Sequence, residues 1–254
     1  MSFPKKKEAI LRFYEELNDF LPENQRKQDI YFPFSGNPSI KDVIEALNIP
    51  HPEIDLIIIN GKSVDFSYKL KHGDRIAVYP VFESLDISPL IRLHPKPLRV
   101  TRFILDVQLG RLARDLRMLG FDTLYSNKYT NPDIVRIAAG EHRIILTRDL
   151  GVLKYKSITH GYWVRSTTRD EQLVEVVKRF DLSKQFQSFK RCLLCNGIIE
   201  LIAKDKIKTQ LLPKTLKYFN IFYRCPDCKK IYWEGSHFKR MQEKINQILE
   251  LTSE

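Results

Sequence analysis

Two pairs of cysteines near the C-terminus constrain the fold of this chain more than any other feature. They are Cys192 with Cys195 and Cys225 with Cys228, and together they are all four cysteines of the sequence. Two thiolates spaced C-x-x-C on a tight turn can bind one ion, and two such turns facing each other supply the four ligands of a tetrahedral zinc site. We therefore expect a structural zinc ion, because a four-cysteine shell leaves no open position for chemistry.

The residues around the pairs favour zinc over other uses of cysteine. Asn196-Gly197 follows the first pair and Pro226-Asp227 lies inside the second, and these residue types are typical of tight turns. The alternatives are two redox pairs, or disulfides in an exported protein. No thioredoxin-like βαβ pattern surrounds the pairs, and the opening MSFPKKKEAI lacks the apolar run of a signal peptide. We expect reduced thiols and a cytoplasmic protein. The most apolar short run, residues 56–59, is too short for a membrane span.

Positive charge is concentrated in the later part of the chain. The formal net charge is +11, divided as −2 over residues 1–95, +6 over residues 96–182 and +7 over residues 183–254. The 29 residues between the cysteine pairs hold Lys204, Lys206, Lys208, Lys214 and Lys217. This excess favours a polyanionic partner, nucleic acid first, over an acidic protein. The alternative is a charge that only keeps the protein soluble.

Residues 1–86 have the pattern of a small β-grasp domain. Extended runs at 9–14 and 30–34 precede a helix that Ser39 caps, and strands follow at 56–59, 64–66 and 75–80. Asn60-Gly61 predicts a hairpin turn. No Gly-Gly tail follows, so we do not expect a sulfur-carrier or conjugation role. Residues 87–100 contain Pro89, Pro95 and Pro97, which is typical of a stiff linker.

Residues 101–182 alternate between apolar strands and amphipathic helices. Strands are expected at 102–106, 123–125, 143–149 and 162–165, with helices at 109–119, 131–140 and 170–180. This alternation predicts an α/β fold with a parallel sheet covered on both faces. We expect Asn131 and Asp170 to cap the last two helices, with a fourth metal ligand as the alternative for Asp170. Residues 183–254 then form the zinc ribbon and a C-terminal helix.

Three acidic residues are placed to form a second, catalytic metal site. Asp106 and Asp149 end two apolar strands, and ligands of parallel sheets bind at the carboxyl ends of the strands. Asp133 lies in the first turn of the helix between them. Converging carboxylates repel one another, and Mg²⁺ or Mn²⁺ would relieve that repulsion and activate water against a phosphodiester. The alternative is that each acid only caps a helix, which is least obvious for Asp149.

Four arginines are candidates for binding phosphate near these acids. Arg111 and Arg114 follow Asp106 on a predicted helix, in a row that continues to Arg117. Arg148 directly precedes Asp149, and Arg165 lies just past the fourth strand. Guanidinium groups here would position a nucleic-acid backbone. A solvated helix face is the alternative for the row on the helix.

Sequence stretches in all three parts of the chain match one known family. Residues 102–182 resemble the Mut-seven C-terminal RNase domain, a relative of the PIN-like nucleases, in RFILDVQLGRLARDLRMLG (102–120), RIILTRDLGVL (143–153) and WVRS (163–166). RCLLCNGIIE (191–200) and YRCPDCKKIYWEGSHFKRM (223–241) are similar to the zinc ribbon that ends the family. DLIIINGKSVDF (55–66) and RIAVYPVFESLDISPL (75–90) resemble the ubiquitin-like domain often fused in front.

The resemblance implies a metal-dependent ribonuclease with a PIN-like fold. Asp106 and Asp149 match the strand-end acids of the family, and Asp133 matches its helix acid, although SNKYTNPDIV (126–135) is less acidic than is usual there. RNA is the implied substrate, and we expect the N-terminal domain to recruit a protein partner or to restrict access to the site. One alternative is a non-catalytic RNA-binding or ribosome-associated zinc-ribbon protein. A phosphoacceptor aspartate is a weaker one, because no lysine ends a late strand and Arg165 substitutes poorly.

Overall fold

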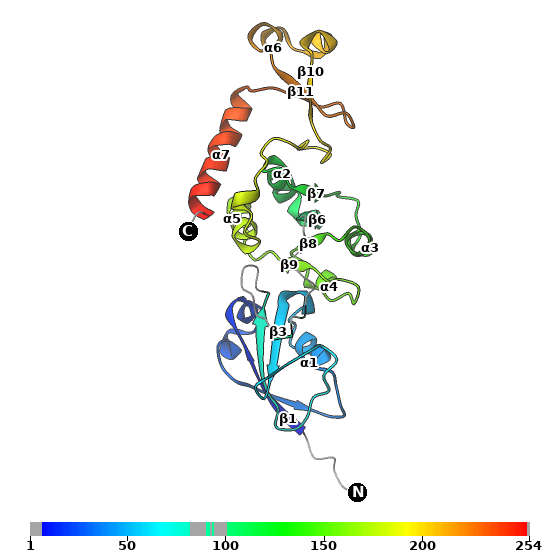
Figure 1. Ribbon diagram of the computed structural model, residues 1–254, viewed down its shortest axis with the longest axis vertical. Helices are drawn as coiled ribbons and strands as arrows, with labels where there is room; N and C mark the ends of the chain where they lie inside the picture. The colour runs from blue at the N-terminus through cyan, green and yellow to red at the C-terminus, as the bar shows by residue number, and fades with distance from the viewer. Residues whose placement is uncertain (1–6, 82–89, 92, 94–100, 253–254) are drawn as a thin grey trace. The chain divides into compact units, whose positions relative to one another are not determined.

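The computed structural model describes residues 7–81, 90, 91, 93 and 101–252 (Figure 1). The chain divides into two compact units, residues 1–99 with 135–163 and residues 100–134 with 164–254. The division falls inside helix α3 (Asn131–Glu141), so the strands of the α/β domain are divided between the two units.

The N-terminal domain is a five-stranded β-grasp sheet. Its strands are β1 (Lys7–Phe13), β2 (Ile30–Phe34), β3 (Ile54–Ile59), β4 (Lys62–Val64) and β5 (Arg75–Pro80), in the order β2-β1-β5-β3-β4. β1 and β5 are parallel, and the other neighbours are antiparallel. Helix α1 (Ile40–Ala46) begins at the predicted cap Ser39, whose side chain accepts from the Asp42 N–H. Asn60 and Gly61 have φ of 50° and 82°, as a two-residue hairpin turn requires.

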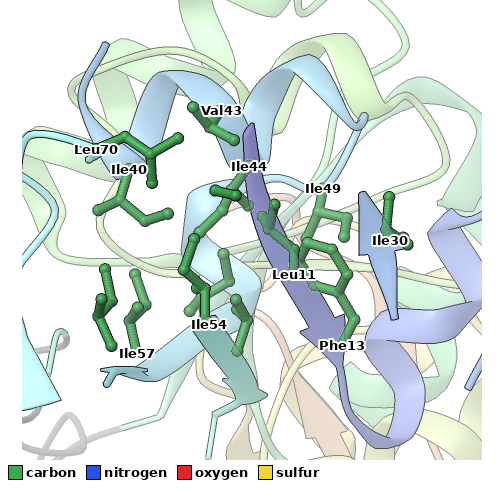
Figure 2. Packing of buried hydrophobic residues seen from close by; sticks show 14 of the residues in the cluster. Leu11, Phe13, Ile30, Ile40, Val43, Ile44, Ile49, Ile54, Ile57 and Leu70 are labelled. Atoms are coloured by element: carbon green, nitrogen blue, oxygen red, sulfur yellow. The ribbon is translucent and has the colours of Figure 1, made fainter. Parts of the chain in front are cut away.

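Buried side chains of the strands and one face of α1 form the core of this domain. In β1, Ala9, Leu11 and Phe13 are buried because successive side chains of a strand point to opposite faces. Figure 2 shows Leu11 and Phe13 gathered with Ile44 of α1 and other buried side chains. Full burial of one such side chain stabilises the fold by about 1.5–3 kcal/mol.

Part of the predicted linker contacts this domain. The Leu93 N–H donates to the Asp55 carbonyl oxygen at 2.8 Å, and the Leu93 side chain packs against the core. The Ile91 N–H donates to the Ser63 hydroxyl at 3.1 Å. The rest of the predicted linker, apart from residue 90, lies outside the described residues.

The second sheet has the predicted parallel α/β architecture. Its strands are β6 (Arg102–Leu105), β7 (Asp122–Leu124), β8 (Ile144–Thr147) and β9 (Gly161–Trp163), in the order β7-β6-β8-β9. β6 pairs in parallel with β7, and β8 pairs in parallel with β9. The other helices here are α2 (Gly110–Met118), α4 (Leu150–Leu153) and α5 (Arg169–Arg179). The strands β6 and β8 are buried along nearly their whole length, as expected for strands covered on both faces.

The C-terminal segment combines a small antiparallel sheet with one long helix. The sheet has the order β10 (Glu200–Ile202), β11 (Phe222–Arg224) and β12 (Ile231–Tyr232). Two 3₁₀ turns (Lys204–Lys206 and Lys208–Gln210) and α6 (Pro213–Tyr218) lie between β10 and β11. Helix α7 (Ser236–Thr252) follows and buries Ile245 and Ile248. Among the described residues, every helix is too short or too polar to cross a bilayer.

Candidate functional site

The four cysteines come together as the sequence predicts. Their Sγ atoms all lie within 4.8 Å of one another. The Sγ–Sγ distance is 3.4 Å for Cys192 and Cys228 and also 3.4 Å for Cys195 and Cys225. A tetrahedral zinc ion with Zn–S bonds of about 2.3 Å places its sulfurs about 3.8 Å apart. The donor set and its spacing therefore fit a four-thiolate metal ion.

The two cysteine turns have the same backbone geometry. The residue after each pair is left-handed, Asn196 with φ 75° and Lys229 with φ 63°. In both turns its N–H donates to the carbonyl oxygen of the first cysteine at 3.0 Å. The N–H of the first cysteine donates to the carbonyl oxygen five residues later. This bond joins Cys192 to Gly197 at 2.7 Å and Cys225 to Lys230 at 2.9 Å. Two equivalent turns facing each other are what a zinc ribbon requires.

Hydrogen bonds favour ionisation of one thiol in this cluster. Burial opposes the thiolate of Cys192, but the Tyr232 hydroxyl, 3.0 Å from Sγ, and nearby backbone N–H groups lower its pKa to about 7. Burial raises the pKa of Cys195 to about 12. A bound cation would stabilise the thiolate form of all four.

The first cysteine turn is attached directly to the α/β domain. The Asn196 amide accepts from the Thr123 N–H at 2.9 Å and donates to Asp122 Oδ1 at 2.8 Å, so it continues the hydrogen bonding of β7. Arg117 is only 4% exposed and donates to the carbonyl oxygens of Thr123 and Leu194, each at 2.9 Å. Arg117 therefore joins the ribbon to α2 and is not part of a solvated basic row.

Asp106 and Asp149 both cap the element that follows their strand. Oδ1 of Asp106, which is 4% exposed, accepts from the Gln108 N–H at 2.8 Å. Oδ1 of Asp149 accepts from the Gly151 N–H at 2.8 Å. The expectation that capping is least obvious at Asp149 is wrong, because Gly151 brings its N–H within reach. These bonds orient both carboxylates at the ends of β6 and β8.

Asp133 forms a capping box with Thr130. Its Oδ2 accepts from the Thr130 N–H at 3.1 Å and from the Thr130 hydroxyl at 2.7 Å. The prediction that Asn131 caps α3 is therefore wrong, and Asn131 is the first residue of the helix. The reciprocal bonds of a Thr-x-x-Asp box satisfy two backbone groups, which a lone asparagine cap does not.

The convergence of the three predicted acids is not established by the structure. Within the part of the chain that the structure describes, the four cysteines are the one group of three or more metal-binding side chains that meets the 4.8 Å spacing. Asp106 and Asp133 belong to one compact unit and Asp149 to the other. A metal ion shared by these carboxylates stays a prediction.

A fourth acid, Asp115, has a structural role that the sequence patterns do not predict. Its side chain is 2% exposed and forms ion pairs with Arg169 and, at 3.0 Å, with Lys244. Lys244 also forms an ion pair with Asp170 at 2.6 Å. Because Thr168 occupies the N-cap position of α5, the prediction that Asp170 caps this helix is wrong. The sequence signal for a buried, paired Asp115 is its position on the apolar face of α2, one turn after Leu112.

The predicted phosphate-binding arginines differ in exposure. Arg111 and Arg114 are exposed on α2, whereas Arg148 and Arg165 are half-buried. The Arg165 N–H donates to Glu175 Oε1 at 2.8 Å, which fixes the backbone after β9. Contact of these four side chains with phosphate stays a prediction.

Tyr125 covers the start of α2. An ideal Cβ at Gly110 would lie 2.6 Å from the Tyr125 ring, and the Tyr125 hydroxyl donates to the Val107 carbonyl oxygen at 3.1 Å. Gly110 thus leaves room for an aromatic ring next to the cap that Asp106 forms.

Comparison with protein families matches most of the chain. The model described as Mut7-C RNAse domain matches residues 101–245, which include both the α/β domain and the cysteine turns. The model described as Mut7-C ubiquitin matches residues 6–86, the β-grasp domain. No curated protein and no solved structure matches the chain.

Proposed function

Because the chain belongs to the Mut7-C RNAse domain family, we propose that it is a ribonuclease that hydrolyses RNA phosphodiester bonds with the help of Mg²⁺ or Mn²⁺. The observation that carries this proposal is the position of Asp106 and Asp149. Each directly follows a strand, the two strands are neighbours in the sheet order, and a backbone N–H orients each carboxylate. Ligands of parallel sheets bind at this edge.

The acidic residues would hold the divalent ion and the arginines would hold the substrate. Asp106, Asp133 and Asp149 offer carboxylate oxygens, the donors that Mg²⁺ and Mn²⁺ prefer. The ion, when bound, acts as a Lewis acid and lowers the pKa of water. Arg111, Arg114, Arg148 and Arg165 would contact phosphate oxygens and position the chain for cleavage. The capping bonds keep the carboxylates in place, which reduces the side-chain entropy lost on metal binding.

The other parts of the chain have supporting roles in this proposal. Zinc held by Cys192, Cys195, Cys225 and Cys228 is structural, and the basic C-terminal segment adds affinity for RNA. The N-terminal domain would bind a protein partner. We propose that the enzyme acts in the cytoplasm, where the four thiols are kept reduced.

The test of this proposal is the double variant Asp106→Asn/Asp149→Asn. Purified protein is incubated with assorted RNAs over a range of Mn²⁺ concentrations, and the cleaved fraction is measured. We expect the wild type to cleave RNA only with added divalent ion, and the double variant to bind RNA without cleaving it. The matched control is Asp205→Asn, which changes an exposed acid between β10 and β11. This variant should cleave RNA at the wild-type rate. Cleavage by the double variant at the wild-type rate would rule the proposal out.

One observation favours a second candidate, a non-catalytic RNA-binding protein. All three acids already accept hydrogen bonds that cap helices or turns, which gives them a structural role without any metal. This candidate predicts RNA binding that weakens steeply with salt, and no cleavage by the wild type at any Mn²⁺ concentration. The same incubation therefore separates the two functions.

A further inference from the structure

A basic cavity of about 660 Å³ lies within the second compact unit, between α2, the end of β12 and α7. Its size is in the range of sites that bind small organic groups. Five lysines and arginines line it, together with three aromatic residues, and Asp115 is the one carboxylate among the residues that line it. Its basic and aromatic lining residues are Arg114, Arg169, Lys230, Arg240, Lys244, Tyr232, Trp233 and Phe238.

The charge of this basic cavity is not balanced by its own carboxylate. Asp115 is already paired with Arg169 and Lys244. Arg114, Lys230 and Arg240 are exposed, and the described part of the chain provides no carboxylate partner for them. Three unneutralised cations around one cavity attract an anion, and their distribution over α2, the residue before β12 and α7 suits an extended anion.

Trp233 is the most exposed aromatic side chain of the basic cavity. It is 37% exposed and its ring lies 6.4 Å from that of Phe219, centroid to centroid, whereas the Tyr232 hydroxyl is held by Cys192 and the Phe238 ring packs closer, on Phe189 at 4.5 Å. An ideal Cβ at Gly235 would lie 2.9 Å from Trp233 Nε1, so the glycine leaves space for the indole. Trp233 also lines a second hollow of about 390 Å³. An exposed indole between two hollows is well placed to stack on a flat ring.

We propose that the basic cavity binds single-stranded RNA, with one base stacked on Trp233 and neighbouring phosphates held by Arg114, Lys230 and Arg240. Grooves that combine cations with an exposed aromatic ring are how proteins hold unpaired nucleotides without sequence preference. A duplex fits less well, because its bases are not free to stack on a side chain. The proposal rests on the proposed function for its choice of RNA as the ligand. It extends that function by assigning a binding site on α2, the helix that begins after the Asp106 cap.

Fluorescence of Trp233 provides a direct test. The sequence has two tryptophans, so in the full chain carrying Trp163→Phe the emission reports Trp233 alone. The protein also carries Asp106→Asn and Asp149→Asn to prevent cleavage, and is titrated with an oligouridine. We expect quenching on binding. Trp233→Ala, measured by anisotropy of a labelled oligouridine, should weaken binding about fivefold or more, and Trp233→Phe should retain most of the affinity.

Charge variants test the phosphate contacts. Lys230→Glu and Arg240→Glu should each weaken oligouridine binding several-fold and reduce its salt dependence. Lys62→Glu makes the same change as Lys230→Glu at an exposed residue of β4, and should change affinity less than twofold. Zinc content is measured for every variant, because Trp233 directly follows β12 of the ribbon.

Two results would overturn the proposal. One is RNA binding by anisotropy with no change in Trp233 emission. The other is quenching by oligoglutamate as strong as by oligouridine, which would assign the basic cavity to an acidic protein. Failure of the proposed function is separate: if the wild type never cleaves RNA but Trp233 is quenched by oligouridine, the binding site stands and the nuclease does not. If the wild type cleaves and Trp233 does not respond, only the binding site fails.

Discussion

Gly197 lies where the two cysteine turns approach each other. An ideal Cβ at this position would lie 3.0 Å from Cys225 Sγ and closer still to Asp227 Oδ2. The glycine follows Asn196, whose amide is fixed by two hydrogen bonds to β7, so the turn has little freedom to move away. The absence of a side chain at Gly197 therefore determines how closely the four sulfurs can come together.

We expect Gly197→Ala to weaken zinc binding about tenfold or more, the loss typical when groups that position metal ligands are changed. The added methyl group would push Cys225 or Asp227 away from the first turn. Competition with a chromophoric chelator measures the effect. Gly140→Ala is the control, because a Cβ there meets nothing within 4 Å and its position in α3 favours alanine. Equal zinc affinity of the Gly197→Ala protein and the wild type would show that the turn adjusts freely.

Helix α2 carries two buried charges that connect it to other elements. Asp115 pairs with Arg169 of α5 and Lys244 of α7, and Arg117 donates to carbonyl oxygens of β7 and the first cysteine turn. A buried carboxylate is costly unless it is paired and hydrogen-bonded, which both partners provide here. The packing of α5 and α7 near α2 thus depends on one acid as well as on apolar contacts.

We expect Asp115→Ala to destabilise the protein by about 3 kcal/mol, the lower end of the range for breaking a buried ion pair, because Arg169 remains partly solvated. Urea unfolding followed by circular dichroism measures the loss. Asp170→Ala removes an ion pair of the same Lys244 on a side chain that is 77% exposed, and should cost no more than about 1 kcal/mol. If the two variants lose the same stability, Asp115 is not the residue that holds these helices.

Much of the whole molecule could be predicted from local patterns in the sequence. The alternation of β1, the Asn60-Gly61 turn and the C-x-x-C spacing each depend on residues close together in the chain, and the β-grasp sheet and the cysteine cluster are confirmed. Contacts between distant residues were not predictable in this way. Asn196 bonds a residue 73 positions away and Asp115 bonds one 129 positions away, and no local periodicity specifies either partner.

At the scale of the molecule, the zinc ribbon belongs to the same compact unit as α2 and β7. A single family model spans the α/β domain and the ribbon, and the two parts share hydrogen bonds at Thr123, Arg117 and Asn196. Thr123 is fully buried, so its N–H has the Asn196 amide in place of water. These hydrogen bonds connect the first cysteine turn to β7, so loss of zinc should affect β7 as well as the ribbon.

Removal of zinc with a chelator should accelerate hydrogen exchange at β7 as well as in the cysteine turns. Without the ion, Cys192 and Cys195 are no longer held together, so Asn196 is no longer fixed in its left-handed conformation and the Thr123 N–H loses its acceptor. Exchange monitored by mass spectrometry should rise in peptides covering residues 121–125 and 191–198, and stay unchanged in peptides covering β1 and β3. Restoring zinc should restore the protection. If exchange rises in the cysteine turns but not in β7, the hydrogen bonds between the two parts survive without metal, and the ribbon is positioned by its packing on α2 and not by its zinc ion.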